Sequence, residues 1–391
     1  MTSSKKRKIA VVLVDRANYG RLKLLLKLLK DCKEIGLEVI CTGSMLIDRF
    51  GSAVDIVKAD GFDVEEKVYI EVEGSHHVTM TKSIGLGIVE FTQVFSRLKP
   101  DFVMIIGDRY EALSVAIAAV YQNICLIHIQ GGEVSGSIDE ITRHTITKLA
   151  HYHFPATKRA GKHIVAMGED PKTVFPLGCP SVDLVVNATK KLSSKTLDNL
   201  GMGKHIDINK EFILVVYHPV TTEINSENAQ MRVLLDAIKE TRKQAIVLWP
   251  NIDPLSDKIS KEIRNFREHN KDYPIHMYKN FAPNVYNSIL AKAACAVGNS
   301  SSFVRDASFI GVPVVLVGTR QDGRELGDSV IRVEPEKNDI LLAIQKQLSN
   351  GRYKCSDLYG KPGVSKKIVE TILSFKPYSQ KKLYFAITEG K

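Results

Sequence analysis

FVMIIGDRYEALSVAIAAVYQNICLIHIQGGEVSGSIDE, residues 102–140, holds two short apolar runs on either side of a longer stretch of mixed character. We predict strands at Phe102–Ile106 and Ile124–Ile129 with a helix at Tyr110–Gln122 between them. The same alternation precedes this stretch, with strands expected at Ile9–Val14 and Glu38–Thr42 and helices at Tyr19–Cys32 and Thr81–Leu98. Strands that alternate with helices are typical of a parallel sheet, so the fold class is α/β.

The pattern pauses between about Cys179 and Lys210, where polar and charged residues replace the strands, and then begins again. We expect further strands at Phe212–Tyr217, Ala245–Leu248, Cys295–Gly298 and Pro313–Val317. The sequence therefore predicts two Rossmann-like domains, residues 1–188 and 189–371, that face each other across a cleft. Ligands of such sheets bind at the carboxyl ends of the strands.

Composition limits the kind of partner. The 391 residues are 44% hydrophobic and 25% charged, as expected for a globular protein, and the formal net charge of +10 favours an anionic ligand. The basic residues are spread along the chain, and no nucleic-acid motif is recognised, so we predict no nucleic-acid partner. The apolar run Ile9–Val14 is too short for a signal peptide, and no segment reaches the roughly 18 to 20 apolar residues of a membrane span. The six scattered cysteines indicate reduced thiols, and the chain is predicted to be cytoplasmic.

Two clusters follow the strands of the opening stretch. Asp108 and Arg109 come directly after the first strand, where a carboxylate meets ligand and an arginine meets phosphate. The alternative is that Asp108 caps the next helix beside a solvated arginine. After the second strand, Glu133 and Asp139 supply carboxylates for acid/base chemistry within a glycine-rich loop. The alternative there is a polar loop that caps the helix beginning near Asp139.

Other candidates accompany these clusters. Arg143 lies one turn beyond Asp139 and is expected to orient it or to bind substrate. His218 follows a strand of the second domain and either neutralises a leaving pyrophosphate or caps the chain. Ser300 and Ser301 lie in a turn before a helix, which is a typical phosphate site, although serine-rich helix caps are common. The segment from Gly318 to Glu325 adds two further arginines.

Together these phrases closely resemble the hydrolysing UDP-N-acetylglucosamine 2-epimerases, and the match covers essentially the whole chain. The resemblance rests on Asp15–Gly20, Gly107–Leu113, Gly131–Asp139, Arg143–Lys148, His218–Thr221, Pro250–Asp253, Gly298–Ser301 and Gly318–Arg320. It implies a GT-B-like fold with a C-terminal helix at about 372–391 that returns to the first domain. It also implies a homodimer or homotetramer, and no metal or other cofactor.

By the same resemblance, the reaction removes the C2 proton and eliminates UDP to give a 2-acetamidoglucal, to which water then adds. The resemblance assigns Asp108, Glu133 and Asp139 as candidate acids and bases, in an order that is left open, and His218 as the group that stabilises UDP. The implied substrate contacts are Arg16, Gly20, Arg109, Arg143, Asn251, Phe281, Ser300, Ser301, Asp306 and Arg320.

Four residues depart from the family pattern. Gln130 stands where several relatives have a catalytic glutamate, so either Glu133 takes that role or the chain is slower or differently specialised. Asn18 replaces a more usual aspartate, Asp306 a ribose-contacting glutamate, and Phe303 a small residue beside the phosphate turn. Phe303 would offer an apolar surface that suits a deoxy sugar.

The leading interpretation of the sequence is a hydrolysing epimerase that converts UDP-GlcNAc to N-acetylmannosamine and UDP for sialic acid synthesis. The second is the same reaction on UDP-2,4-diacetamido-2,4,6-trideoxy-glucose for legionaminic acid synthesis. A GT-B glycosyltransferase, which would pass the sugar to an acceptor, is the alternative from another class.

Overall fold

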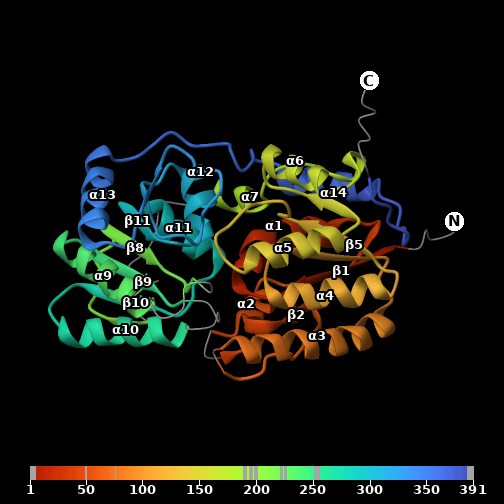
Figure 1. Ribbon diagram of the computed structural model, residues 1–391, viewed down its shortest axis with the longest axis horizontal. Coiled ribbons are helices and arrows are strands. Elements are labelled where there is room, and N and C mark those ends of the chain that lie inside the picture. Colours follow the sequence, from red (N-terminus) through yellow and green to blue (C-terminus); the bar gives the residue numbers. More distant parts are fainter. Residues whose placement is uncertain are drawn as a thin grey trace.

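The fold comes from a computed structural model, which describes residues 6–48, 51–74, 76–187, 192, 197, 201–220, 223, 227–250 and 256–384. Two α/β domains lie side by side, as Figure 1 shows in red to yellow for the first and green to blue for the second. Each domain has a parallel sheet with helices on both faces, which confirms the predicted class of two Rossmann-like, GT-B-like domains.

The first domain is built on a six-stranded parallel sheet with the order β3-β2-β1-β4-β5-β6. Its strands are β1 (Arg7–Leu13), β2 (Ile35–Thr42), β3 (Val64–Val68), β4 (Phe102–Ile106), β5 (Cys125–Ile129) and β6 (Tyr152–Phe154). Its helices are α1 (Arg16–Asp31), η1 (Gly43–Leu46), α2 (Ala53–Ala59), α3 (His77–Leu98), α4 (Tyr110–Tyr121), α5 (Asp139–Leu149), α6 (Lys158–Ala166), η3 (Pro171–Thr173) and α7 (Ser181–Val185).

The second domain has a seven-stranded sheet with the order β13-β12-β11-β8-β9-β10-β7, in which only the pairing of β7 with β10 is antiparallel among the described strands. The strands are β7 (Met202–Gly203), β8 (Phe212–Val216), β9 (Gln244–Leu248), β10 (Ile275–Tyr278), β11 (Cys295–Gly298), β12 (Val314–Val317) and β13 (Val330–Val333). The helices are α9 (Glu227–Glu240), α10 (Ser256–His269), α11 (Pro283–Lys292), η4 (Phe303–Ala307), α12 (Ser308–Ile310) and α13 (Lys337–Asn350). The last helix, α14 (Val364–Leu373), follows them in the chain but packs in the core of the first domain.

All eight strands expected from the sequence are present within three residues of the predicted bounds, because each is an apolar run that is buried on both faces of its sheet. Five described strands were not expected, namely β3, β6, β7, β10 and β13, and each of them has five residues or fewer. β3 lies at a sheet edge and alternates half-buried and exposed residues before the buried Val68, and β6 has three residues. Helix α1 forms as expected: Asp15 accepts a hydrogen bond from the Asn18 amide at its start, and its leucines enter the core.

The end of the chain returns to the first domain. The returning helix is α14, Val364–Leu373, so the predicted range of about 372–391 was wrong in its placement: the described residues 374–384 form no helix, and residues 385–391 lie outside the described part. Pro377 explains this ending, since proline cannot donate to a helix and disfavours it in the residue before. The predicted boundary between residues 188 and 189 likewise lies outside the described residues.

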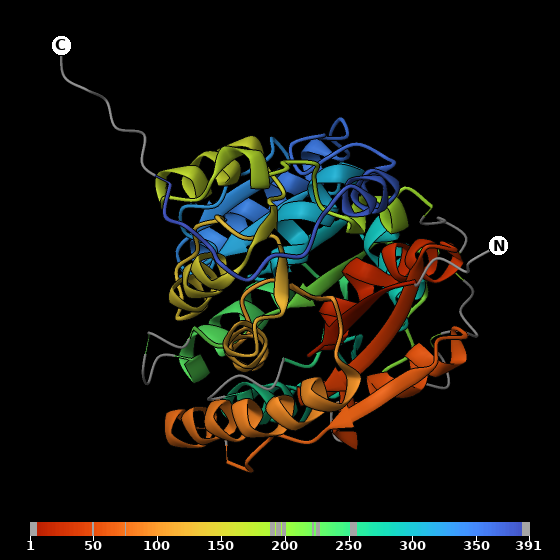
Figure 2. The same ribbon diagram turned by 90° about the vertical axis from the view of Figure 1, so that its right-hand side faces the viewer.

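An aromatic cluster fixes this returning segment. Phe375 stacks on Tyr152, with ring centroids 3.6 Å apart, and also contacts Phe102, Phe154 and Phe175. Figure 2 shows the blue C-terminal segment crossing the first domain, where the carbonyl group of Lys376 accepts a hydrogen bond from the Tyr152 hydroxyl. The chain that follows the second domain, from α14 to Phe375, is therefore part of the core of the first domain.

No described helix is long and apolar enough to cross a membrane. All six cysteines are free thiols in the structure. The predicted cytoplasmic location stays a prediction.

We expect Phe375→Ala to lower the free energy of unfolding by about 3 to 5 kcal/mol, because it leaves a cavity among four aromatic rings. Urea unfolding measures the change. Leu342→Ala is the matched control, since Leu342 on α13 is 64% exposed and its removal should change the free energy by less than about 0.5 kcal/mol. A loss below about 1 kcal/mol for Phe375→Ala would show that the returning segment is not part of the core.

Candidate active site

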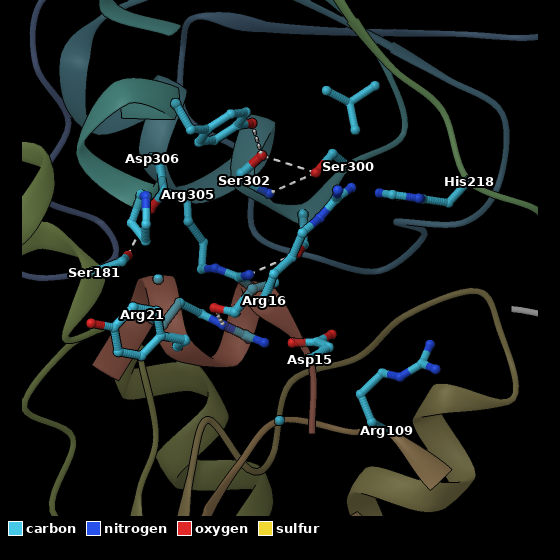
Figure 3. Close-up of a pocket in the computed structure, with 18 of the residues that line it drawn as sticks. Asp15, Arg16, Arg21, Arg109, Ser181, His218, Ser300, Ser302, Arg305 and Asp306 are labelled. Carbon is cyan, nitrogen blue, oxygen red and sulfur yellow. Dashed lines mark hydrogen bonds between the residues drawn. The ribbon is translucent and has the colours of Figure 1, made fainter. Parts of the chain in front are cut away.

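A pocket lies between the two domains, at the carboxyl ends of both sheets. Figure 3 shows His218 and the serine turn on one side and Arg16, Arg21 and Arg109 on the other. Every site residue expected from the sequence lines it except Asn251, which lies outside the described residues. These are Arg16, Gly20, Asp108, Arg109, Gln130, Glu133, Asp139, Arg143, His218, Phe281, Ser300, Ser301, Asp306 and Arg320.

Asp108 is held by arginines from both domains. Arg143, almost fully buried on α5, donates to its carboxylate, and the Arg324 guanidinium lies 3.8 Å away. Burial alone would raise the pKa of Asp108, but Arg143, Arg324 and Arg21 together hold it well below its usual range. Asp108 is therefore an anion at neutral pH. It does not cap α4, whose N-cap residue is Arg109, so the capping alternative was wrong.

Glu133 is the most enclosed of the three candidate carboxylates, with 6% of its side chain exposed. Arg324 forms an ion pair with its Oε2 atom, and Arg305 Nη1 lies 3.6 Å from the same oxygen. The Arg143 guanidinium donates to the Glu133 carbonyl oxygen at 2.9 Å and to the Ser135 hydroxyl at 3.1 Å. Arg143, which was expected to orient Asp139 or to bind substrate, thus organises Asp108 and the glycine-rich loop.

Asp139 begins helix α5 and lies nearer the entrance. Its carboxylate accepts a hydrogen bond from Ser137 at 2.9 Å and lies 3.5 Å from Arg320 of the second domain. The loop before it packs directly on that domain: a Cβ added to Gly136 would lie 2.1 Å from the carbonyl oxygen of Thr319. The loop is therefore a domain contact as well as a helix start, and it positions two carboxylates in the pocket.

Arg109 is turned toward its own helix. Its guanidinium donates to both carboxylate oxygens of Glu111, at 3.1 and 3.2 Å, and both side chains are buried. Burial raises the pKa of Glu111 to about 8, against the pull of Arg109. Arg109 lines the pocket, but two of its guanidinium N–H groups, which were expected to meet phosphate, are hydrogen-bonded to the Glu111 carboxyl group instead.

Gln130 connects two elements beneath the pocket. Its backbone is left-handed, with φ of 65°, which turns the chain sharply after β5. The Gln130 Oε1 atom accepts a hydrogen bond from Arg21 at 2.5 Å, and its Nε2 atom donates to the Cys179 sulfur at 2.7 Å. A side-chain amide does not ionise near neutral pH and so cannot serve as a general acid or base, and this geometry describes an anchoring side chain.

The second domain presents the serine turn of residues 300–302. The turn follows Gly298, whose φ of 140° brings it so close to Val216 that a Cβ would lie 2.1 Å from the Val216 carbonyl oxygen. The Ser300 and Ser302 hydroxyls are 2.9 Å apart, and Arg305 donates to Ser301 at 2.7 Å. Hydroxyls and a buried guanidinium at the start of a helical segment form a surface suited to phosphate oxygens.

His218 and Arg16 complete this side. Buried Asn299 fixes the backbone of His218 by accepting from its amide at 2.7 Å and donating to its carbonyl at 2.8 Å. Arg16, on α1 of the first domain, reaches across and donates to the carbonyl oxygens of Trp249, at 3.1 Å, and Lys279.

Phe281 also lines the pocket. It is mostly buried and packs on Tyr278 with ring centroids 4.6 Å apart.

Two family departures are explained by packing. Asp306 lines the pocket and accepts a hydrogen bond from Ser181 of the first domain at 2.6 Å. Phe303, however, is fully buried in the core of the second domain and does not line the pocket. The expectation that Phe303 offers the ligand an apolar surface was wrong, because the helical turn points it toward the sheet.

Sequence reasoning assigned no role to several pocket residues. These are Asp15, Arg21, Ser181, Tyr286, Asn287 and Arg305, while Arg324 was noted only as one of the two arginines of the segment from Gly318 to Glu325. Arg305 carries a usable signal, since it lies one helical turn after Ser301 and bonds to it. Arg21 and Ser181 carry none, because their partners are more than 100 residues away along the chain. Within the described part of the chain, no group of three or more His, Cys, Asp or Glu residues forms a candidate metal site.

Two Rossmann-like domains that meet at one polar pocket define a GT-B-like protein. The structure of UDP-GlcNAc 2-epimerase from Neisseria meningitidis bound to UDP-GlcNAc has the same fold, with a TM-score of 0.78, 18% identity, and coverage of 94% of this chain and 100% of that one. The sequence profile described as UDP-N-acetylglucosamine 2-epimerase matches residues 27–373. The chain therefore belongs to the UDP-N-acetylglucosamine 2-epimerase family.

Two curated relatives are similar over most of their length. UDP-N,N'-diacetylbacillosamine 2-epimerase (hydrolyzing) from Legionella pneumophila is 34% identical, covering 96% of this chain and 97% of that protein. GDP/UDP-N,N'-diacetylbacillosamine 2-epimerase (hydrolyzing) from Campylobacter jejuni is 31% identical and covers 87% of each. Both relatives are named for the 2,4-diacetamido sugar nucleotide, which is the second of the two substrates that the sequence suggested.

Acid is expected to destabilise the fold through His128, which lies fully buried on β5 and hydrogen-bonds the Gly107 carbonyl oxygen. Burial lowers the pKa of His128 to about 3, against the pull of that carbonyl group. Below about pH 6.5 this histidine is protonated in the unfolded chain but stays neutral in the folded chain. The free energy of unfolding therefore falls between about pH 6.5 and pH 3. Buried His151 and His153, whose pKa values burial also lowers, add to this loss.

Urea unfolding between about pH 6.5 and 4.5 tests this prediction. His128→Asn should reduce the slope of unfolding free energy against pH by up to about 1.4 kcal/mol per pH unit. His269→Gln, at an exposed position on α10, should keep the wild-type slope. An unchanged slope in His128→Asn would mean that His128 is protonated in the folded chain.

Gln130→Ala should lower the free energy of unfolding by about 1 to 3 kcal/mol, because it leaves the Arg21 guanidinium and the Cys179 thiol without their partner. Chemical denaturation measures the loss, and Gln93→Ala on the exposed face of α3 is the control. A change as small as the control's would rule out an anchoring role for Gln130.

Proposed function

We propose that this chain is a hydrolysing 2-epimerase of a UDP-sugar, and that its preferred substrate is UDP-2,4-diacetamido-2,4,6-trideoxy-glucose. The observation that supports the proposed reaction is that carboxylates of the first domain line the same pocket as the serine turn and His218 of the second. Elimination of a nucleoside diphosphate needs both kinds of group, namely a base at the sugar carbon and cationic or hydrogen-bonding groups at the departing phosphate.

In the proposed reaction a carboxylate takes the C2 proton, and the electron pair forms the C1–C2 double bond as the C1–oxygen bond to UDP breaks. Water then adds: its hydroxyl joins C1, and a proton joins C2 from the opposite face. The products are UDP and the free 2-epimeric sugar, and protein groups on both faces of the ring are required.

The carboxylates differ in what they can contribute. Asp108 is held ionised by its arginines, so it fits a proton acceptor or an electrostatic role and not a general acid. Glu133 and Asp139 remain candidates for the second proton transfer. Gln130 anchors Arg21 beneath them, which leaves the work of the family's glutamate at that position to Glu133.

Nucleotide binding is proposed for the other side of the pocket. Phe281 would meet uracil, Asp306 the ribose, and Ser300 and Ser301 the phosphates. His218 would neutralise the charge that develops on UDP as it leaves, and Arg16 and Arg320 lie where they can share it. Asn251 is a proposed nucleotide contact outside the described residues. A homodimer or homotetramer without metal or cofactor remains our expectation.

The choice of sugar rests on the relatives. The proteins from Legionella and Campylobacter, both more than 30% identical to this chain, are named for the diacetamido sugar. The family as a whole is named for UDP-GlcNAc, which remains the second candidate. The relatives therefore reverse the order of substrates inferred from the sequence, and Phe303 no longer contributes to the choice.

Incubation of the purified chain with each nucleotide sugar in deuterated water, without acceptor or added metal, tests the proposal by NMR. We expect UDP and a free 2-epimeric sugar carrying deuterium at C2, formed faster from the diacetamido nucleotide. Asp108→Asn should reduce turnover by about 100-fold or more, since it removes an ionised group at the pocket.

Each alternative gives a different result. Faster release from UDP-GlcNAc would reverse the substrate choice. A product without deuterium at C2 would exclude proton abstraction there, and sugar transfer that occurs only when an acceptor is added would indicate a glycosyltransferase.

A further inference from the structure

Arg324 crosses from the second domain to the carboxylates of the first. It lies in the loop after β12, and 4% of its side chain is exposed. One terminal nitrogen pairs with Glu133 and the other lies 3.8 Å from Asp108. No other described residue makes an ion pair with both carboxylates.

Three further arginines and a tyrosine, from both domains, surround Arg324 and its two carboxylates. Arg143 of α5 and Arg305 of η4 share the two carboxylates, Arg21 of α1 approaches Asp108, and the Tyr359 hydroxyl lies on the side of Glu133. The Arg324 Nε, Arg305 Nε and Glu133 Oε1 atoms are buried without a hydrogen-bond partner among the described residues. The cluster is therefore incompletely satisfied and faces the pocket, where a bound ligand can complete it.

We propose that Arg324 is a positioning residue through which the second domain holds the carboxylates of Asp108 and Glu133 at a fixed separation. This inference rests on the proposed epimerase function. Arg143 is fixed to the first domain, whereas Arg324 moves with the second. The separation of the two carboxylates therefore depends on a side chain that the second domain supplies.

The test compares Arg324→Met and Arg324→Lys with Arg232→Met. Arg232 is a matched control because it also pairs with a glutamate in the second domain, but it lies on the surface of α9 with 63% of its side chain exposed. We would measure kcat and KM from about pH 3.5 to pH 9 and the affinity for UDP by calorimetry.

For Arg324→Met we expect kcat to fall by about 100-fold while KM and UDP affinity change by less than about threefold. The acid limb of the kcat profile should move to higher pH, because loss of a cation raises the pKa of Asp108. Arg324→Lys should restore the position of the acid limb but only part of kcat, since an ammonium cannot bridge two carboxylates as a guanidinium does. Arg232→Met should match the wild type.

Two results would overturn the inference. An increase in KM with unchanged kcat and acid limb would show that Arg324 only binds substrate. A loss of UDP affinity with the acid limb unmoved would show that it only fastens the domains.

Carboxyl carbon-13 NMR titration separates this inference from the proposed function, because it needs no turnover. Spectra of Asp108→Asn and Glu133→Gln assign the two signals. If the wild type binds UDP but converts neither sugar, the proposed function fails, while a raised carboxyl pKa in Arg324→Met still supports the positioning role. An unchanged carboxyl titration overturns it.

Discussion

The buried ion pairs of Asp108 and Glu133 with Arg143, Arg305 and Arg324 are the constraint on which the pocket depends. Taking a charged group out of water costs several kcal/mol, so such groups persist in a protein interior only when their partners are held in place. Here the partners come from α5, η4 and the loop after β12. The pocket therefore exists as a charged assembly only where both domains contribute to it.

Parallel sheets make this assembly possible. All strands of the first sheet point the same way, so the residues after β4 and β5 emerge at one edge, and the same holds for β8, β11 and β12 of the second sheet. The two edges face each other because the chain crosses between the domains and α14 then packs into the core of the first. Glycines at positions 136 and 298 allow the backbone approaches that close the remaining gaps.

The two domains contribute chemically different side chains to the pocket. The first domain contributes carboxylates, which suit proton transfer at the sugar, and the second contributes hydroxyls, an imidazole and arginines, which suit phosphate. Gln130 lies at the start of the carboxylate loop but has an anchoring role, because its amide hydrogen-bonds to both Arg21 and Cys179. Cys179 contacts Ser181, which in turn donates a hydrogen bond to Asp306 of the other domain. The two domains are thus joined by a chain of hydrogen bonds at the pocket.

By itself the sequence determined the fold class, the buried strands and most of the pocket, because apolar runs such as Phe102–Ile106 and polar clusters at their ends are local patterns. It did not reveal the edge strand β3, whose residues are largely polar, or the end of α14. Only the tertiary structure decided that Arg109 pairs with Glu111, that Phe303 faces the core, and that Arg324 meets Glu133. The direction of a side chain and its partner 191 residues away depend on how two domains pack, and no local pattern encodes that distance.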